Sequence, residues 1–154
     1  MSTTITIPTD LVSVSFDPDS PFSHHSWKVI IQRRAQDGHH HDFLGYSSKS
    51  YQKALISARR KAKRKLPETQ SPPRSEATRI ELPDELTRFW YNERCRGNPH
   101  ADTDPWYIHL EIAGKVYHGE GLEFEEALRE AQLNYTQGWE GPRLPRRLRQ
   151  GNSV

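Results

Sequence analysis

The feature that most constrains this chain is an internal repeat in which residues 27–62 and 106–135 share one order of short apolar runs. Each copy has an alternating run that begins at a tryptophan, a glycine-containing turn, a second short apolar run and a stretch with helical spacing. A repeat takes precedence over other signals because each copy folds as one supersecondary unit. The order predicts strand, turn, strand and helix in each half. We therefore expect an α+β protein made of two tandem small antiparallel-sheet-plus-helix modules, related as a pseudo-repeat.

The strands are predicted from alternation. Trp106, Ile108 and Leu110 fall on one face of an extended segment, and the residues between them fall on the other. This period of two is typical of a half-buried strand. Residues 27–34 repeat the pattern less cleanly, because Ile30 joins the polar face.

The helices are predicted from apolar residues at spacings of four, three and four, which place one apolar stripe on each helix. The two stripes are Tyr51, Leu55, Ala58, Ala62 and Phe124, Leu128, Ala131, Tyr135. We expect Ser48 or Ser50 to cap the first helix, since a serine oxygen accepts a hydrogen bond from a free backbone N–H. The glutamates that open the second helix favour its start through the helix dipole.

The segments around these runs set the expected domain organisation. Residues 1–20 form an N-terminal segment in which the alternation over 11–16 predicts an extra strand, and residues 21–66 form the first module. Residues 67–77 are a proline-rich linker, residues 78–140 form the second module, and residues 141–154 are a flexible arginine-rich tail. Within the second module, residues 82–97 are expected to form a short helix that begins near Pro83 and ends at Gly97.

Charge differs strongly between the modules, although the formal net charge is only +2. Residues 21–66 contain eleven basic and two acidic residues, whereas residues 78–140 contain six basic and thirteen acidic ones. The first module should attract a polyanion such as nucleic acid, and the second should repel it. A solvated helix face is the alternative reading of the same charge run. The predicted nucleic-acid-binding residues are Lys28, Gln32, Arg34, Lys49, Lys53, Arg59, Arg60, Lys61, Lys63, Arg64 and Lys65.

The first module resembles a known family of DNA-binding domains. A strand from Trp27, a turn at Asp37-Gly38, a second strand through residues 43–46 and a helix from Tyr51 resemble the sheet-plus-helix domains that bind arm sites in tyrosine recombinases, and the related plant ethylene-response-factor domain. This resemblance implies that the sheet enters the major groove, with residues 28, 32 and 34 facing DNA and residues 49 and 53 near phosphates. Residues 48–54 also resemble the start of a helix in the double-stranded-RNA-binding domain.

Other chemistries are not indicated by the sequence. We found no glycine-rich phosphate loop, nucleophile elbow or HExxH motif, and no base adjoins the single cysteine, Cys95. The histidines at 24–25 and 39–41 are adjacent, which does not suit metal ligation. We therefore expect no enzymatic activity, no cofactor and no metal. The chain lacks an apolar run long enough for a membrane span and begins without a secretory signal, so we expect no membrane association and a cytoplasmic location.

A protein-binding adaptor, chaperone or inhibitor is the alternative function. In that reading the acidic module and its aromatic run make the contact or drive self-association, and the acidic module could mask the basic one. A PxxP pattern in the tail adds a possible peptide ligand. The predicted partner-binding residues are Phe89, Trp90, Tyr91, Arg146 and Arg147.

Overall fold

The computed structural model describes residues 3–19, 26–66 and 78–140, and it is an α+β structure of antiparallel strands and two long helices. The predicted fold class is therefore confirmed. The chain divides into two compact units, Met1–Leu82 and Pro83–Val154. We describe each unit by itself.

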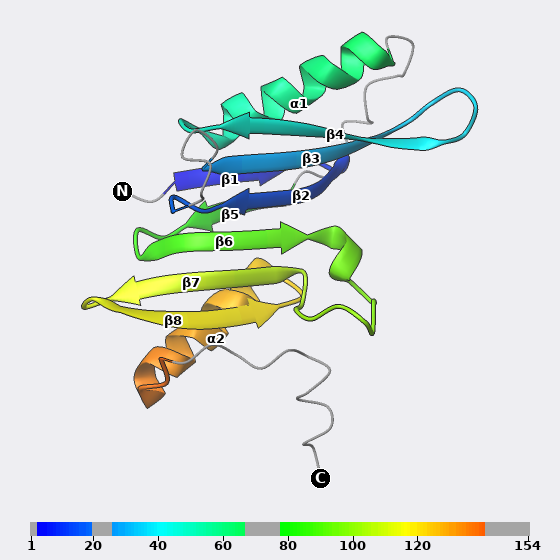
Figure 1. The fold of residues 1–154 in the computed structure, drawn as a ribbon. Coiled ribbons are helices and arrows are strands. Elements are labelled where there is room, and N and C mark those ends of the chain that lie inside the picture. Colours follow the sequence, from blue (N-terminus) through cyan, green and yellow to red (C-terminus); the bar gives the residue numbers. More distant parts are fainter. Residues whose placement is uncertain (1–2, 20–25, 67–77, 141–154) are drawn as a thin grey trace. The chain divides into compact units, whose positions relative to one another are not determined.

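The first unit is built on a three-stranded antiparallel sheet in the order β4-β3-β2 (Figure 1). Its strands are β2 (Leu11–Phe16), β3 (Trp27–Arg34) and β4 (His40–Ser47), and helix α1 (Tyr51–Lys65) follows β4 and packs on β3 and β4. The alternation seen in the sequence decides which face is covered. Trp27, Val29 and Ile31 are buried, whereas Lys28, which lies between Trp27 and Val29, is exposed.

Two further strands complete the first unit. Strand β1 (Thr3–Ile7) pairs antiparallel with β5 (Thr78–Leu82), with Ile5 opposite Ile80. The phenol of Tyr51, the first residue of α1, donates a hydrogen bond of 2.6 Å to the carbonyl oxygen of Thr6, and burial raises its pKa. Strand β2 confirms the strand expected over 11–16, while the sequence analysis had not predicted β1 or β5.

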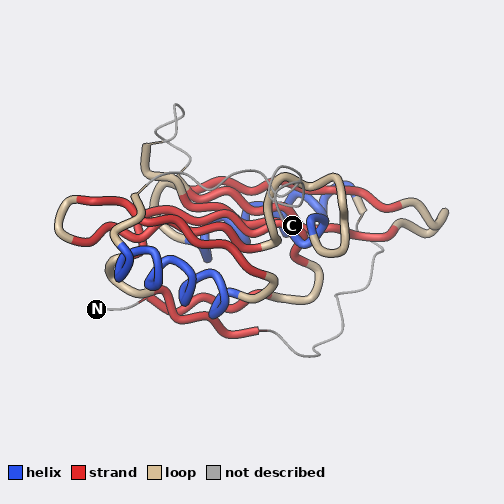
Figure 2. Tube along the Cα trace, turned by 90° about the horizontal axis from the view of Figure 1, so that it is seen from below, coloured by secondary structure: helices blue, strands red, loops and turns tan. Residues whose placement is uncertain are grey.

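The second unit has three strands and a helix in the same order as β2, β3, β4 and α1, and its described residues contain no counterpart of β1 or β5. Strands β6 (Leu86–Asn92), β7 (Trp106–Ile112) and β8 (Lys115–Gly121) pair antiparallel in sequence order, and helix α2 (Phe124–Gln137) packs on β7 and β8. Each helix packs on the two strands that precede it; the helices are blue in Figure 2. The turn between β7 and β8 uses Ala113 and Gly114, both with positive φ, as a tight two-residue hairpin requires. That the two units arose by duplication stays a prediction.

The helix predicted over residues 82–97 is wrong, because the middle of this segment is strand β6. Leu86 donates its N–H to the carbonyl of Pro83 at 3.1 Å, and this turn leads into β6. Phe89 and Tyr91 are buried while Trp90 lies on the other face, which is the period of a strand. Only Glu93–Cys95 forms a 3₁₀ turn, capped where Arg94 donates its N–H to the side chain of Asn92. The aromatic run pairs with β7, and this cross-strand packing outweighs the helical reading.

Each helix lies close to its sheet because the strand that precedes it has a glycine at the point of contact. A Cβ on Gly45 would lie 1.9 Å from the carbonyl oxygen of Ala54, and one on Gly119 would lie 2.1 Å from that of Ala127. These distances are far below van der Waals contact. A glycine on the strand and an alanine on the helix therefore set the spacing of the two layers in both units.

Several predicted segments lie outside the described residues. These are the proline-rich linker 67–77 and the tail 141–154, which holds the predicted partner residues Arg146 and Arg147. Within the ranges that the structure describes, no helix has the length and apolarity to cross a membrane.

Candidate nucleic-acid interface

Helix α1 is positioned by its apolar stripe and by its N-cap. The predicted stripe is confirmed, since Tyr51, Leu55, Ala58 and Ala62 are all buried against the sheet. Ser50 is the cap, because its hydroxyl accepts the backbone N–H of Lys53 at 3.2 Å. Burial of this one stripe leaves the other sides of the helix to polar and charged residues and to Ile56. No residue of α1 is acidic.

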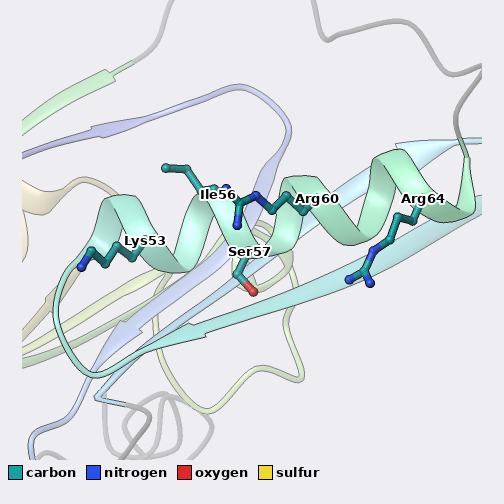
Figure 3. Close-up of a pocket in the computed structure, with 5 residues that line it drawn as sticks. All are labelled: Lys53, Ile56, Ser57, Arg60 and Arg64. Atoms are coloured by element: carbon teal, nitrogen blue, oxygen red, sulfur yellow. The ribbon is translucent and has the colours of Figure 1, made fainter.

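The outer side of α1 carries a shallow hollow of about 540 Å³. Figure 3 shows the side chains that line it, all from the one helix: Lys53, Ile56, Ser57, Arg60 and Arg64. Three of these five are cationic, one offers a hydroxyl, and Ile56 is 45% exposed. At about 1.5 Å rise per residue, the three cations span about 16 Å along the helix axis. We call these five residues the outer stripe.

The cations of the outer stripe are available to a ligand. Within the described parts of the chain, Lys53, Arg60 and Arg64 form no ion pair with an acidic side chain. Lys63, Arg64 and Lys65 occupy the last turn, where the helix dipole favours positive charge. This structural role does not extend to Lys53, which lies in the first turn.

Arg59 has a structural partner, unlike the outer stripe. Its guanidinium lies 3.8 Å from the carboxylate of Asp10, which also forms an ion pair with Arg33. The Asp10 side chain is only 5% exposed and that of Arg33 only 12%, so the pair is largely withdrawn from water. The sequence analysis had proposed Arg59 for nucleic acid and had not singled out Asp10 or Arg33. Residues 23 positions apart gave no local signal of this pairing.

Lys61 and Lys49 lie at the margins of the basic helix. The ammonium of Lys61 lies 5.7 Å from the ring centroid of Tyr46, a cation–π contact at the outermost strand, β4. Lys49 is exposed in the turn that leads from β4 to α1. Neither residue belongs to the outer stripe.

The three predicted site residues on the sheet lie away from α1. Lys28, Gln32 and Arg34 share the face of β3 opposite to the one that Val29 and Ile31 bury under the helix. On β4, Gln32 pairs with Asp42 and Arg34 with His40. We call Lys28, Gln32 and Arg34 the sheet face. The predicted site is thus divided into two surfaces, one on each side of the first unit.

In the second unit, the aromatic run divides between two faces. Phe89 and Tyr91 belong to the core, where the ring of Tyr91 lies 4.5 Å from that of Trp106. Trp90 is half-buried on the face away from α2, with its ring centroid 5.6 Å from Tyr107 and 5.1 Å from His109. Of the predicted aromatic contacts, only Trp90 lies outside the core.

The same face of the second unit holds two packed histidines. His109 and His118 are opposite each other on β7 and β8, with ring centroids 4.2 Å apart, and the Tyr107 phenol is 2.6 Å from Nδ1 of His118. Burial lowers the pKa of His118. Burial, followed by the charge of Glu120, raises the pKa of Tyr107. No group of three or more His, Cys, Asp or Glu suited to a metal occurs among the described residues.

The acidic residues that open α2 are engaged with nearby groups. Glu123 forms an ion pair of 3.3 Å with Arg96, and Glu126 accepts the backbone N–H of Leu122 at 3.1 Å. Glu125 is exposed in the same turn. This helix start has the opposite charge to that of α1, in agreement with the asymmetry seen in the sequence.

Comparison with protein-family models, with curated proteins and with solved structures finds no match to this chain.

Proposed function

We propose that this protein is a non-catalytic nucleic-acid-binding protein that holds the phosphate backbone of duplex DNA or RNA on the outer stripe of α1. The observation that carries the proposal is a fifteen-residue helix with seven cations and no acidic residue, whose outer side presents Lys53, Arg60 and Arg64 to solvent. Such an array neutralises phosphates and releases condensed counterions, the term that dominates non-specific affinity.

The composition of the outer stripe supports a backbone contact. It contains no aromatic side chain, so it offers no surface on which unstacked bases could stack, as single-strand binders require. The Ser57 hydroxyl can donate a hydrogen bond to a phosphate oxygen, and Ile56 can make an apolar contact with a sugar. We therefore expect binding that depends steeply on salt and weakly on sequence.

The experiment is an anisotropy titration of labelled duplex DNA, duplex RNA and single strands at several salt concentrations. Arg60→Glu/Arg64→Glu should weaken duplex binding at least about tenfold and reduce the slope of log K against log salt by about 2, since each lost phosphate contact removes about 0.9. These two arginines are preferable to Arg59 and Lys61, whose contacts with Asp10 and Tyr46 would confound the result.

Arg79→Glu/Arg129→Glu is the matched control, because it changes the net charge by the same amount at exposed positions outside α1. It should bind like the natural chain apart from a small loss from long-range repulsion. Equal weakening in both variants would assign the effect to overall charge and refute the helix as the site.

A protein-binding adaptor is the second candidate function. It is favoured by exposed apolar residues at the end of α2, where Leu133 is 53%, Tyr135 47% and Trp139 57% exposed. Exposed tryptophan and tyrosine are frequent anchors of protein interfaces. Trp139→Ala should then abolish a complex recovered by pull-down while leaving nucleic-acid binding unchanged.

A further inference from the structure

The two surfaces that carry the predicted nucleic-acid residues face away from each other. The outer stripe lies on the side of α1 remote from the sheet, and the sheet face lies on the side of the sheet remote from α1. All these residues belong to the first unit. Their relation therefore depends only on how α1 packs on β3 and β4 (Figure 1).

Arg33 fixes the direction of its neighbours. Its guanidinium forms the ion pair with Asp10, which is also close to Arg59 of α1, so Arg33 points to the helix side. Successive side chains of a strand point to opposite faces. Gln32 and Arg34 must then point away from the helix, as Lys28 does by the same alternation.

The sheet face is suited to a groove. Lys28 and Arg34 are exposed, six residues apart, and span about 20 Å along the strand. Gln32 and Arg34 lie where β3 pairs with β4 alone, a two-stranded ribbon of the kind that the major groove of a duplex admits, whereas Lys28 lies between β2 and β4. Arginine and glutamine are the side chains that most often read guanine and adenine edges. Asp42 opposite Gln32 reduces the positive charge, so this surface is weaker than the outer stripe.

One duplex segment cannot reach both surfaces. A helix about 10–12 Å across, together with the sheet below it, stands between them. A duplex is stiff over about 150 base pairs and does not bend around a body of this size without a large cost.

We infer that the first unit holds two duplex segments at once, one on the outer stripe of α1 and one on the sheet face, so that a single chain bridges them. The inference rests on the proposed function. It adds that the protein brings two duplexes, or two distant parts of one duplex, side by side.

The experiment is a capture assay with the full chain. A biotinylated duplex of about 30 base pairs, far shorter than the bending length, is fixed to beads, and capture of a second, fluorescent duplex is measured as protein is added. Capture should rise with protein and then fall in excess, because separate chains then saturate the two duplexes. Light scattering of the free protein at the same concentrations establishes its oligomeric state.

Lys28→Glu/Arg34→Glu is the decisive variant. It should lower capture at least about tenfold while changing the anisotropy affinity for one duplex by less than about threefold, since the stronger outer stripe is intact. Lys28→Gln/Arg34→Gln, which adds no repulsion, should give an intermediate loss. The Arg79→Glu/Arg129→Glu control should capture normally.

The outcomes separate the two proposals. Absence of duplex binding by the natural chain refutes the proposed function. Normal binding without capture refutes bridging alone, and so does full capture by Lys28→Glu/Arg34→Glu. Capture that accompanies a dimer of the free protein and survives in that variant would assign bridging to self-association.

Discussion

Replacement of Gly45 by alanine tests whether the close approach of sheet and helix fixes the position of α1. The added methyl group would lie 1.9 Å from the carbonyl oxygen of Ala54 and 2.6 Å from the backbone nitrogen of Ala58. Both obstacles are backbone atoms inside the helix, so no side-chain rotation relieves the contact. The helix must move away by more than 1 Å to reach about 3.4 Å, and this separates the buried stripe from β3 and β4.

The expected cost follows from overpacking of a filled core. Insertion of a methylene group into a packed interior costs about 1–3 kcal/mol, and the rigid obstacles place Gly45→Ala at the upper end. For a unit of this size, each kcal/mol lowers the melting temperature by roughly 4–8 °C. We therefore expect a loss of about 10 °C or more in a thermal melt followed by circular dichroism.

Gly97→Ala is the comparison variant. A Cβ there meets no atom within 4 Å, although its φ of +70° lies in the left-handed region. Its cost should come from the backbone alone, about 1 kcal/mol. A melting temperature for Gly45→Ala equal to or above that of Gly97→Ala would refute the argument that this glycine sets the helix–sheet distance.

Three further predictions concern the residues around the site. Asp10→Asn should destabilise the protein by about 3 kcal/mol in urea unfolding, because it leaves Arg33 buried without its counter-ion; a loss below about 0.5 kcal/mol would show that the pair contributes little. Ser50→Ala should cost about 1 kcal/mol through the lost cap on Lys53, whereas Ser50→Asp, which retains an acceptor, should not. The pKa of His118 is lowered in the folded state, so as the pH falls the unfolded chain takes up this proton before the folded chain does, and stability should fall below about pH 6.5. His118→Gln should make the stability depend less on pH in urea titrations at pH 5 and 7. An unchanged pH dependence would contradict the assignment to His118.

The elements that local periodicity specifies were predictable from the sequence. Apolar residues at spacings of four, three and four predicted both helices. The first helix buries its whole predicted stripe, whereas the second buries Phe124 and Ala131 and leaves Tyr135 exposed. Residues 106–112 bury alternate side chains as their pattern requires. In contrast, residues 86–92 begin after a proline and contain three consecutive aromatic residues, so their local features also suit a helix. This segment is a strand because it pairs with β7, and no local sequence pattern reveals that pairing.

The candidate site was predictable in composition but not in arrangement. The charge count identified the first unit as basic, yet it gave equal weight to every cation. Which of them contact other groups depends on distant residues. Arg59 meets Asp10 across 49 positions and Lys61 meets the ring of Tyr46, whereas the cations of the outer stripe lie together on one exposed side of α1. Sequence periodicity did place Lys28, Gln32 and Arg34 on the sheet face that the helix leaves uncovered, and the structure agrees.

The two units pack a helix on a sheet through the same contact, but the outer residues of the two helices differ in charge. In each, a strand glycine meets a helix alanine, Gly45 with Ala54 and Gly119 with Ala127, so the helices can be compared position by position from these contacts. One residue before each alanine, the first helix has Lys53 and the second has Glu126; six residues after it, they have Arg60 and Leu133. The residues that touch the sheet are alike because close packing restricts them. The outer residues do not pack on the sheet, so close packing does not restrict their charge, and it is at these positions that the basic surface proposed to bind phosphates on the first unit has no counterpart on the second.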